Sequence, residues 1–112
     1  MLAFMTRLVL LALVVTGASS ALAGEVVQVV ISKLAFVPAE VSIRAGDIVR
    51  WTNHDFVPHT ATAMPGPGGV TMDVTIPPGG SVEWLATSAT GPVPYFCRFH
   101  PNMKGVIKLM TE

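Results

Sequence analysis

The sequence predicts an all-β domain built as an antiparallel sandwich or barrel. From Glu25 onward, short runs rich in β-branched residues alternate with turns of Gly, Pro, Asn and Asp. No long stretch repeats its apolar residues at the period of a helix. Many short strands separated by turn residues are typical of a layered β fold, in which each strand buries one face. No internal repeat, linker or second domain is visible in the sequence.

The predicted strands alternate apolar and polar residues, so that one face of each strand is buried. In the first strand, 25–32 (EVVQVVIS), Val29 and Ile31 lie on the same face. The next segment, 34–36, runs into Pro38, which fits an edge strand or a turn because proline cannot donate to a sheet ladder. The other predicted strands, in chain order, cover residues 41–44, 48–52, 60–63, 72–76, 81–86, 93–96 and 105–110.

Turn residues separate these strands. Ala45-Gly46-Asp47 ends one strand, and the Gly- and Pro-rich segment 64–69 follows another. Pro77-Pro78-Gly79-Gly80 is the strongest turn signal in the chain. Between these turns the alternation predicts that Trp51 and Trp84 face the core.

Residues 1–23 are predicted to be a secretory signal peptide. Arg7 precedes the apolar run LVLLALVV, and small residues then end in an Ala-x-Ala cleavage site at Ala21-Leu22-Ala23. The alternative is a membrane anchor, but a spanning helix needs about 20 apolar residues. We therefore expect export to the periplasm without a stable membrane anchor, and a single mature domain of residues 24–112.

Composition excludes several classes of function. The chain has seven basic and seven acidic residues, and no block of either sign that would bind nucleic acid or steer a strongly charged partner. It has one cysteine, so no disulfide can form within the chain. A single cysteine in an exported protein is either paired with another molecule or has a chemical role. Metal ligation is such a role, and it would also tie together the strands of a small core.

The segment 95–105 (YFCRFHPNMKG) holds the residues with the clearest chemistry. Cys97, His100 and Met103 follow one another at intervals of three. A helix would align Cys97 and His100 on one face, but Pro101 disfavours a helix here because it lacks an N–H group. We therefore expect a tight loop between two strands. Thiolate, imidazole and thioether are three ligands of a blue-copper site, which needs one more histidine.

His59 is the predicted second histidine ligand. It follows Asn53 and a short loop, and Pro58 restricts the backbone just before it. The competing residue is His54, which lies in a polar turn where a solvated histidine is expected. A ligand must be held by a structured wall, which favours His59. Each candidate ligand taken alone also has an ordinary explanation. A single histidine is most often solvated or hydrogen-bonded, and a single cysteine such as Cys97 is most often a small buried apolar residue.

The segments 97–103 (CRFHPNM) and 53–59 (NHDFVPH) carry a resemblance to a known family. The chain resembles the cupredoxins, the small blue-copper proteins, and within them the amicyanin group. The likeness extends over most of residues 26–108. It implies a Greek-key β-sandwich with one type 1 copper near one end. The implied ligands are His59, Cys97 and His100 in a near-trigonal set, with Met103 as a weak axial ligand.

The resemblance also implies supporting residues and partners. Asn53 would fix the loop around His59, and it could bond the backbone at Arg98, where the group often has a small polar residue. Electrons would pass through His100 to transient redox proteins that dock on an apolar patch around it. By analogy with the family, this patch would contain Phe99, Pro101, Pro58, Met64 and Pro65. We expect a monomeric electron carrier, not an enzyme.

Other functions fit the sequence less well. A periplasmic copper carrier or storage protein is the alternative, although carriers usually expose Met- or Cys-rich motifs, which this chain lacks. A copper enzyme would need an open coordination position and further histidines, and the chain has three in total. Met is a poor zinc ligand, which disfavours a zinc site. A thiol hydrolase based on Cys97 would leave Met103 without a role.

Overall fold

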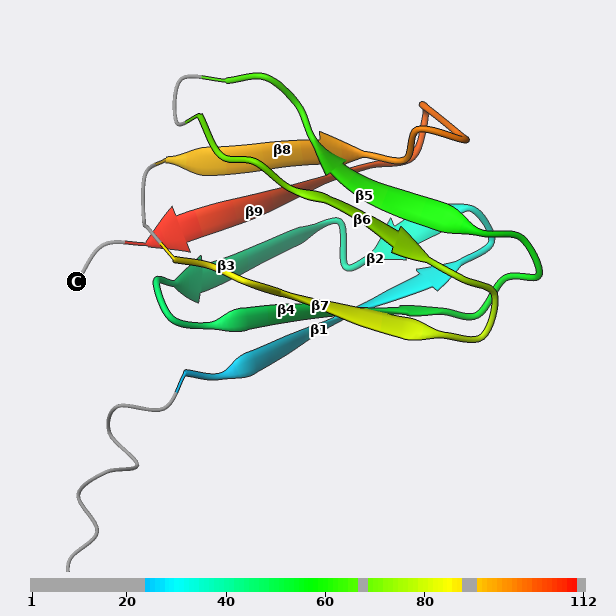
Figure 1. Cartoon of the computed structure of the whole chain (residues 1–112), viewed down its shortest axis with the longest axis horizontal. Coiled ribbons are helices and arrows are strands. Elements are labelled where there is room, and N and C mark those ends of the chain that lie inside the picture. Colours follow the sequence, from blue (N-terminus) through cyan, green and yellow to red (C-terminus); the bar gives the residue numbers. More distant parts are fainter. Residues whose placement is uncertain (1–23, 67–68, 88–90, 111–112) are drawn as a thin grey trace, which may run out of the picture.

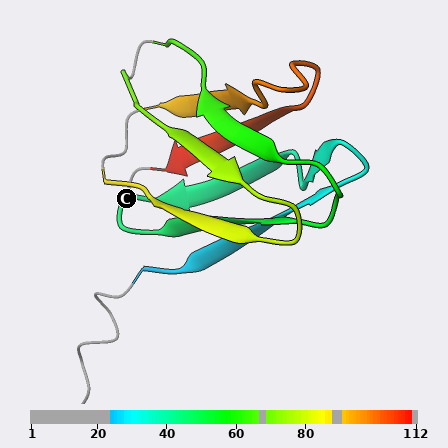
Figure 2. The same ribbon diagram turned by 45° about the vertical axis from the view of Figure 1, so that its right-hand side comes forward.

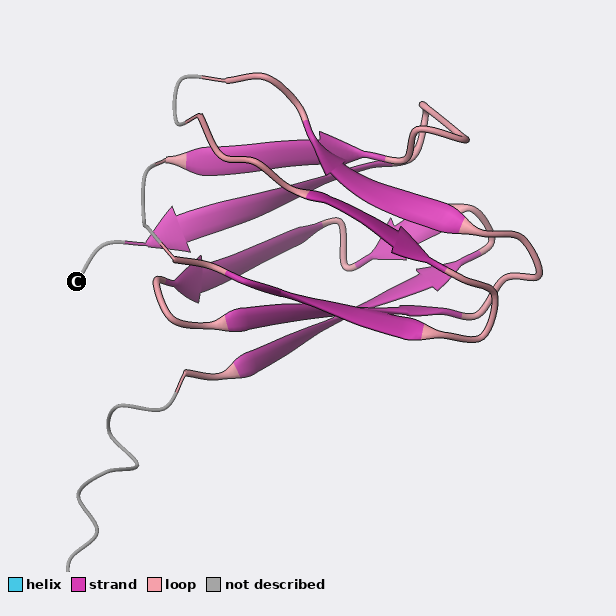
Figure 3. Ribbon diagram, viewed as in Figure 1, coloured by secondary structure: helices cyan, strands magenta, loops and turns pink. Residues whose placement is uncertain are grey.

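The computed structural model of the chain describes residues 24–66, 69–87 and 91–110, and the regular elements in these ranges are all β-strands (Figure 3). The predicted signal peptide lies outside the described residues. In chain order the strands are β1 (Val26–Ser32), β2 (Ala35–Val37), β3 (Glu40–Arg44), β4 (Ile48–Asn53), β5 (His59–Ala63), β6 (Asp73–Ile76), β7 (Ser81–Leu85), β8 (Pro92–Phe96) and β9 (Lys104–Met110).

Two sheets pack face to face as a sandwich (Figure 1). One sheet has the strand order β2-β1-β4-β7, and the other has the order β3-β9-β8-β5-β6. The chain passes from one sheet to the other several times, so neighbouring strands are often distant in the sequence. The predicted all-β sandwich is confirmed. Within the three described ranges, no helix is long and apolar enough to cross a membrane.

The prediction of a purely antiparallel arrangement is wrong for two strand pairs. β1 pairs with β4 in parallel, from Val26 opposite Ile48 to Ile31 opposite Asn53. β3 pairs with β9 in parallel as well. A parallel pair needs a crossover connection, and β2 with β3 provides one between β1 and β4. Alternation of apolar residues cannot reveal this, because it is the same in parallel and antiparallel strands.

The strand boundaries differ from the predicted ones by one residue at several ends. The main difference concerns β5, which begins at His59 and not at Thr60. His59 is therefore held by the strand pairing with β6, opposite Ile76. The three-residue β2 lies at the edge of its sheet and ends just before Pro38, as the proline predicted.

The core is centred on two aromatic residues that join the sheets. Trp51 of β4 and Tyr95 of β8 are both buried, and their rings meet edge to face at a centroid distance of 5.6 Å. Trp51 Nε1–H donates to the Tyr95 hydroxyl at 3.2 Å. Burial raises the pKa of Tyr95 to about 12. Gly105 of β9 lies opposite Tyr95 and leaves room for its ring.

Four connections meet at one end of the sandwich (Figures 1 and 2). These are the turn between β1 and β2, the loop between β4 and β5, the loop between β8 and β9, and the turn between β6 and β7. Hydrogen bonds join the first two, because the N–H groups of Lys33 and Leu34 donate to Asp55. All four predicted ligands lie in or next to the second and third connections.

Candidate metal centre

Three predicted ligands converge at this end of the sandwich. His59 begins β5, Cys97 follows the last residue of β8, and His100 lies in the loop beyond. Cys97 Sγ lies 3.7 Å from His59 Nδ1 and 3.8 Å from His100 Nδ1. These three ligand atoms all lie within 4.8 Å of one another. His59 and Cys97 are fully buried and His100 is half-buried, so the group lies just beneath the surface.

The loop between β8 and β9 is tight, as predicted. Its two ends are joined by a hydrogen bond from Cys97 N–H to Met103 C=O at 3.1 Å. Two turns lie within it, closed by His100 N–H to Cys97 C=O and by Met103 N–H to His100 C=O. Pro101 lies between these bonds and has no N–H group to leave unpaired. The spacing of three residues between the ligands therefore corresponds to successive turns and not to a helix face.

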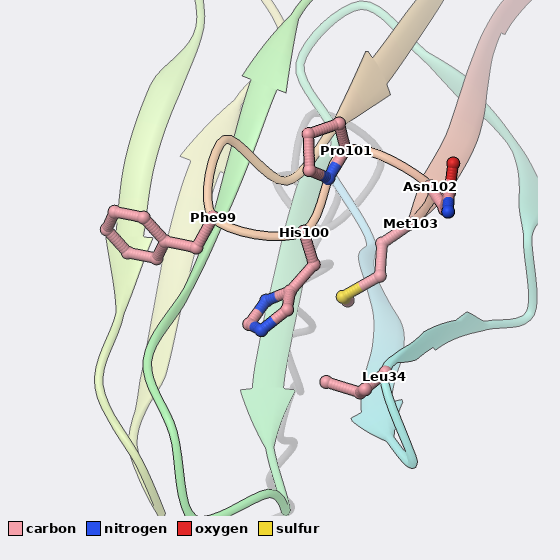
Figure 4. A pocket seen from close by; sticks show the side chains of 6 residues that line it. All are labelled: Leu34, Phe99, His100, Pro101, Asn102 and Met103. Atoms are coloured by element: carbon pink, nitrogen blue, oxygen red, sulfur yellow. The ribbon is translucent and has the colours of Figure 1, made fainter.

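Met103 is the last residue of the loop before β9 and is 4% exposed. Figure 4 shows its thioether and the imidazole of His100 directed toward the same space, with Leu34 on the opposite side. Phe99 points away from this space. The surface pocket here is lined by Leu34, Phe99, His100, Pro101, Asn102 and Met103.

The structure separates the two competing histidines. The ring of His59 is buried, and its centroid lies 5.0 Å from that of His100. His54 is exposed, and its backbone N–H donates to Ile31 C=O to hold the start of the loop. Among the described residues, the group with metal-ligand geometry contains His59 and not His54.

Asn53 fixes the loop before His59, in agreement with its predicted role. Its side-chain amide donates to Val57 C=O at 2.8 Å and to Ile76 C=O at 3.1 Å. Its carbonyl oxygen accepts the N–H of Asp55 at 2.9 Å. The amide group is buried, and these bonds tie the loop between β4 and β5 both to itself and to the end of β6. The bond that Asn53 could have made to the backbone at Arg98 is not formed, because Arg98 N–H donates to the Thr60 hydroxyl and the Asn53 amide bonds Val57, Ile76 and Asp55.

Thr60 makes the connection to residue 98 instead. Its hydroxyl accepts the backbone N–H of Arg98 at 2.8 Å, and its own N–H donates to Cys97 Sγ at 3.3 Å. Thr60 therefore stabilises both the sulfur and the chain just beyond it. This role of Thr60 was not predicted from the sequence. Its position directly after His59 could have indicated this role. A threonine buried beside a metal ligand needs a hydrogen-bond partner for its hydroxyl.

The Thr60 hydroxyl belongs to a chain of hydrogen bonds that returns to Arg98. It donates to the Thr62 hydroxyl, 2.9 Å away, because the single hydroxyl proton of Thr62 is used toward Asp73. Thr62 donates to Asp73 Oδ1 at 2.7 Å, and Arg98 Nε–H donates to the same oxygen at 3.2 Å. Arg98 is thus bound through both its backbone and its side chain. The bonds from Arg98 N–H through Thr60 and Thr62 to Asp73 form a chain that runs in one direction, so they polarise one another.

Asp55 is the second residue that the sequence analysis missed. Its carboxylate accepts the N–H of Lys33 at 2.8 Å and the N–H of Leu34 at 3.0 Å. Its Oδ2 also lies 2.9 Å from His59 Nε2. Burial acts to raise the pKa of Asp55, but hydrogen bonds from Leu34, Lys33 and His59 outweigh it and hold this pKa below its usual range. The sequence feature that could have indicated this role is the position of Asp55, an acidic residue four positions before the candidate ligand His59.

The donor set fits copper. A thiolate and a thioether are soft ligands that suit Cu(I), and imidazole suits both oxidation states. The aliphatic and aromatic residues around Cys97 keep the sulfur from water, because Cys97, Ala61 and Tyr95 are all buried. A metal site of this kind is tuned by its dry surroundings and by hydrogen bonds to its ligands. Thr60 N–H provides such a bond to the sulfur.

The fold and this site define a class of protein. Residues 5–108 match the family model of the cupredoxin-like domain. The chain belongs to the cupredoxins. Its similarity extends to amicyanin-alpha of Methylorubrum extorquens, which is 39% identical over 82 residues, 71% of this chain and 68% of that protein. The resemblance to the amicyanin group is confirmed, and the family together with the His-Cys-His group supports copper binding.

Solved structures agree on the fold. Amicyanin from Paracoccus versutus matches with a TM-score of 0.62 and 27% identity, over 75% of this chain and 80% of that one. A copper-containing nitrite reductase from Thermus scotoductus matches with a TM-score of 0.70 and 24% identity. The match covers 77% of this chain and 22% of the reductase chain. This second likeness concerns the fold alone.

The predicted apolar patch differs from the observed surface. Leu34 and Phe99 are 50% and 49% exposed beside His100, and Leu34 was not predicted. Met64 lines a different pocket, beside β8, where its N–H donates to Pro94 C=O. The inclusion of Pro58, Met64 and Pro65 in the docking patch stays a prediction.

Proposed function

We propose that this chain is an exported blue-copper protein that carries single electrons between redox partners. The observation that supports this most directly is the convergence of one sulfur and two imidazole nitrogens within 4.8 Å. His59, Cys97 and His100 would hold one type 1 copper, with Met103 as the fourth ligand. Copper bound there would supply a one-electron couple between Cu(I) and Cu(II).

The burial of the ligands favours an electron carrier over a copper carrier or storage protein. Metal release needs ligands that can be exchanged at the surface, and His59, Cys97 and Met103 are 0%, 0% and 4% exposed. An electron needs no opening of the site. His100 is the most exposed of the four residues, so electrons would leave the site for a partner through its ring. The three histidines of the chain also leave no ligands for the second centre of a copper enzyme.

Redox partners would dock around His100. Leu34, Phe99 and Pro101 form an apolar surface there, and a small apolar surface suits weak and transient complexes. We expect residues 1–23 to direct export to the periplasm and to be cleaved between Ala23 and Gly24. The intact mass of the exported protein tests the cleavage. A mature form that retains the segment LVLLALVV would indicate an anchor.

Titration of the copper-free mature chain with Cu(II) tests the function. We expect one copper per chain and an intense blue absorption from the bond between sulfur and copper. Cys97→Ser should abolish the colour, and His59→Ala should abolish or strongly change it. His54→Ala is the matched control and should leave the spectrum unchanged. If His54→Ala abolishes the colour, the ligand assignment is wrong.

Cycling the copper-loaded protein separates the two candidate functions. An electron carrier should be reduced and reoxidised repeatedly without loss of metal, even with a Cu(I) chelator in solution. A copper carrier should lose its metal to the chelator after the first reduction. Rapid loss of copper from the reduced protein would therefore support the alternative.

A further inference from the structure

His59 is held from both sides of its ring. Nδ1 faces Cys97 Sγ at 3.7 Å, and Nε2 faces Asp55 Oδ2 at 2.9 Å. An ionised carboxylate only accepts hydrogen bonds, so Nε2 carries the proton and donates it to Asp55. Nδ1 is then left with a lone pair directed toward Cys97. The hydrogen bond to Asp55 thus selects the tautomer in which His59 can bind a metal.

Asp55 cannot easily turn away from His59. One of its oxygens accepts the N–H of Lys33, and the other accepts the N–H of Leu34 as well as His59 Nε2. Lys33 and Leu34 have φ angles of 53° and 60°, a conformation that side chains disfavour and that these hydrogen bonds help to hold. The Asp55 side chain is only 16% exposed. The carboxylate is therefore a fixed negative charge beside a buried ring.

We propose that Asp55 is a positioning residue that fixes the metal-binding tautomer of His59 and lowers the reduction potential of the copper. The inference rests on the proposed function. A histidine that donates to a carboxylate is a stronger metal ligand than one that donates to a neutral group. A fixed negative charge near the site also stabilises the more highly charged ion. Both effects favour Cu(II) over Cu(I), so removing the charge raises the potential.

The sequence contains a matched control for this residue. Asp47 also accepts two backbone N–H groups, one on each carboxylate oxygen, from Glu25 and Arg44. It precedes the first residue of β4, whereas Asp55 lies just beyond the last. The six residues of β4, at about 3.3 Å each, separate the two turns by roughly 20 Å. Asp47→Asn makes the same chemical change in the same kind of turn, but without a histidine.

Voltammetry of the copper-loaded variants tests the effect on the potential. We expect Asp55→Asn to lower the affinity for Cu(II) by about 10–100-fold, and the affinity for Cu(I) by less. Each factor of ten in this difference raises the potential by about 59 mV for a one-electron couple. Asp47→Asn should leave the potential at the wild-type value. An Asp55→Asn potential equal to or below that of Asp47→Asn would overturn the proposal.

Nitrogen-15 NMR of the copper-free wild-type chain is the second test and does not require Asp55→Asn to fold. We expect the proton of His59 on Nε2 and none on Nδ1. A proton on Nδ1, or a mixture of both tautomers, would overturn the proposal. A different result, the absence of copper binding by the wild-type chain, would refute the proposed function itself. Copper binding with an unchanged Asp55→Asn potential would refute only the role of Asp55.

Discussion

Gly105 supports the core beneath the candidate metal centre, and Gly105→Ala tests how tightly that core is packed. A Cβ added at this position would lie 2.5 Å from Tyr95 Cζ and 2.6 Å from the Tyr95 hydroxyl oxygen, where ordinary contacts are 3.4–4 Å. Tyr95 has little freedom to move, because Phe36 and Trp51 pack against it at centroid distances of 4.8 and 5.6 Å. Either its ring or the β8–β9 pairing must therefore shift by about 1 Å.

The expected cost combines two effects. Overpacking of a well-packed core typically costs about 1–3 kcal/mol. A shift of the Tyr95 ring also weakens its hydrogen bond from Trp51, and a buried donor left without a partner costs about 1–3 kcal/mol. The smaller conformational freedom of unfolded alanine offsets about 0.4–1 kcal/mol. We expect a net destabilisation of about 2–4 kcal/mol, or a fall in Tm of at least about 8 °C for a domain of this size.

Urea unfolding of the copper-free protein, followed by tryptophan fluorescence, measures this change. Gly66→Ala is the control, because among the described residues its Cβ would meet Met64 C=O alone, at an ordinary contact distance of 3.8 Å. That variant should be as stable as the wild type or slightly more stable. In a Tyr95→Leu background, Gly105→Ala should cost much less, because the ring atoms that it meets are absent. A Gly105→Ala variant within about 0.5 kcal/mol of the wild type would refute this description of the core.

Two further predictions concern the polar contacts. Thr60→Val removes the acceptor of Arg98 N–H but keeps the N–H that donates to Cys97, so we expect a loss of about 1–2 kcal/mol in urea unfolding with the blue absorption retained. Wild-type stability in Thr60→Val would contradict the role of its hydroxyl. Backbone hydrogen bonds from Arg44 and Glu25 hold the pKa of Asp47 below its usual value of 3.8. The ionised form therefore adds stability above that pH, and this stability is lost as the pH falls through the depressed pKa. Asp47→Asn should have a lower Tm than the wild type at pH 7, and the two values should converge as the pH falls through the depressed pKa of Asp47. A difference in Tm that stays constant as the pH falls from 7 into the acid range would show that another effect of the substitution is responsible.

The sequence alone determined the local features of this protein. Alternating apolar residues and turn residues predicted strands close to the observed ones, because each strand must bury one face. Pro101 excluded a helix at the ligand segment, because proline lacks an N–H group wherever it occurs. The polar turn around His54 likewise indicated that His59 was the better candidate. These conclusions depend on residues that are close together in the chain.

Tertiary structure decided what depends on residues that are far apart in the chain. The parallel pairing of β1 with β4 is one example, because a crossover leaves no mark on the alternation of either strand. The tie from Thr60 to Arg98 is another, since it joins residues 38 positions apart. Asp55 bonds His59 nearby but is held by a turn more than 20 residues earlier. A side chain's partners across a sandwich depend on strand register and layer packing, which the linear order of residues does not specify.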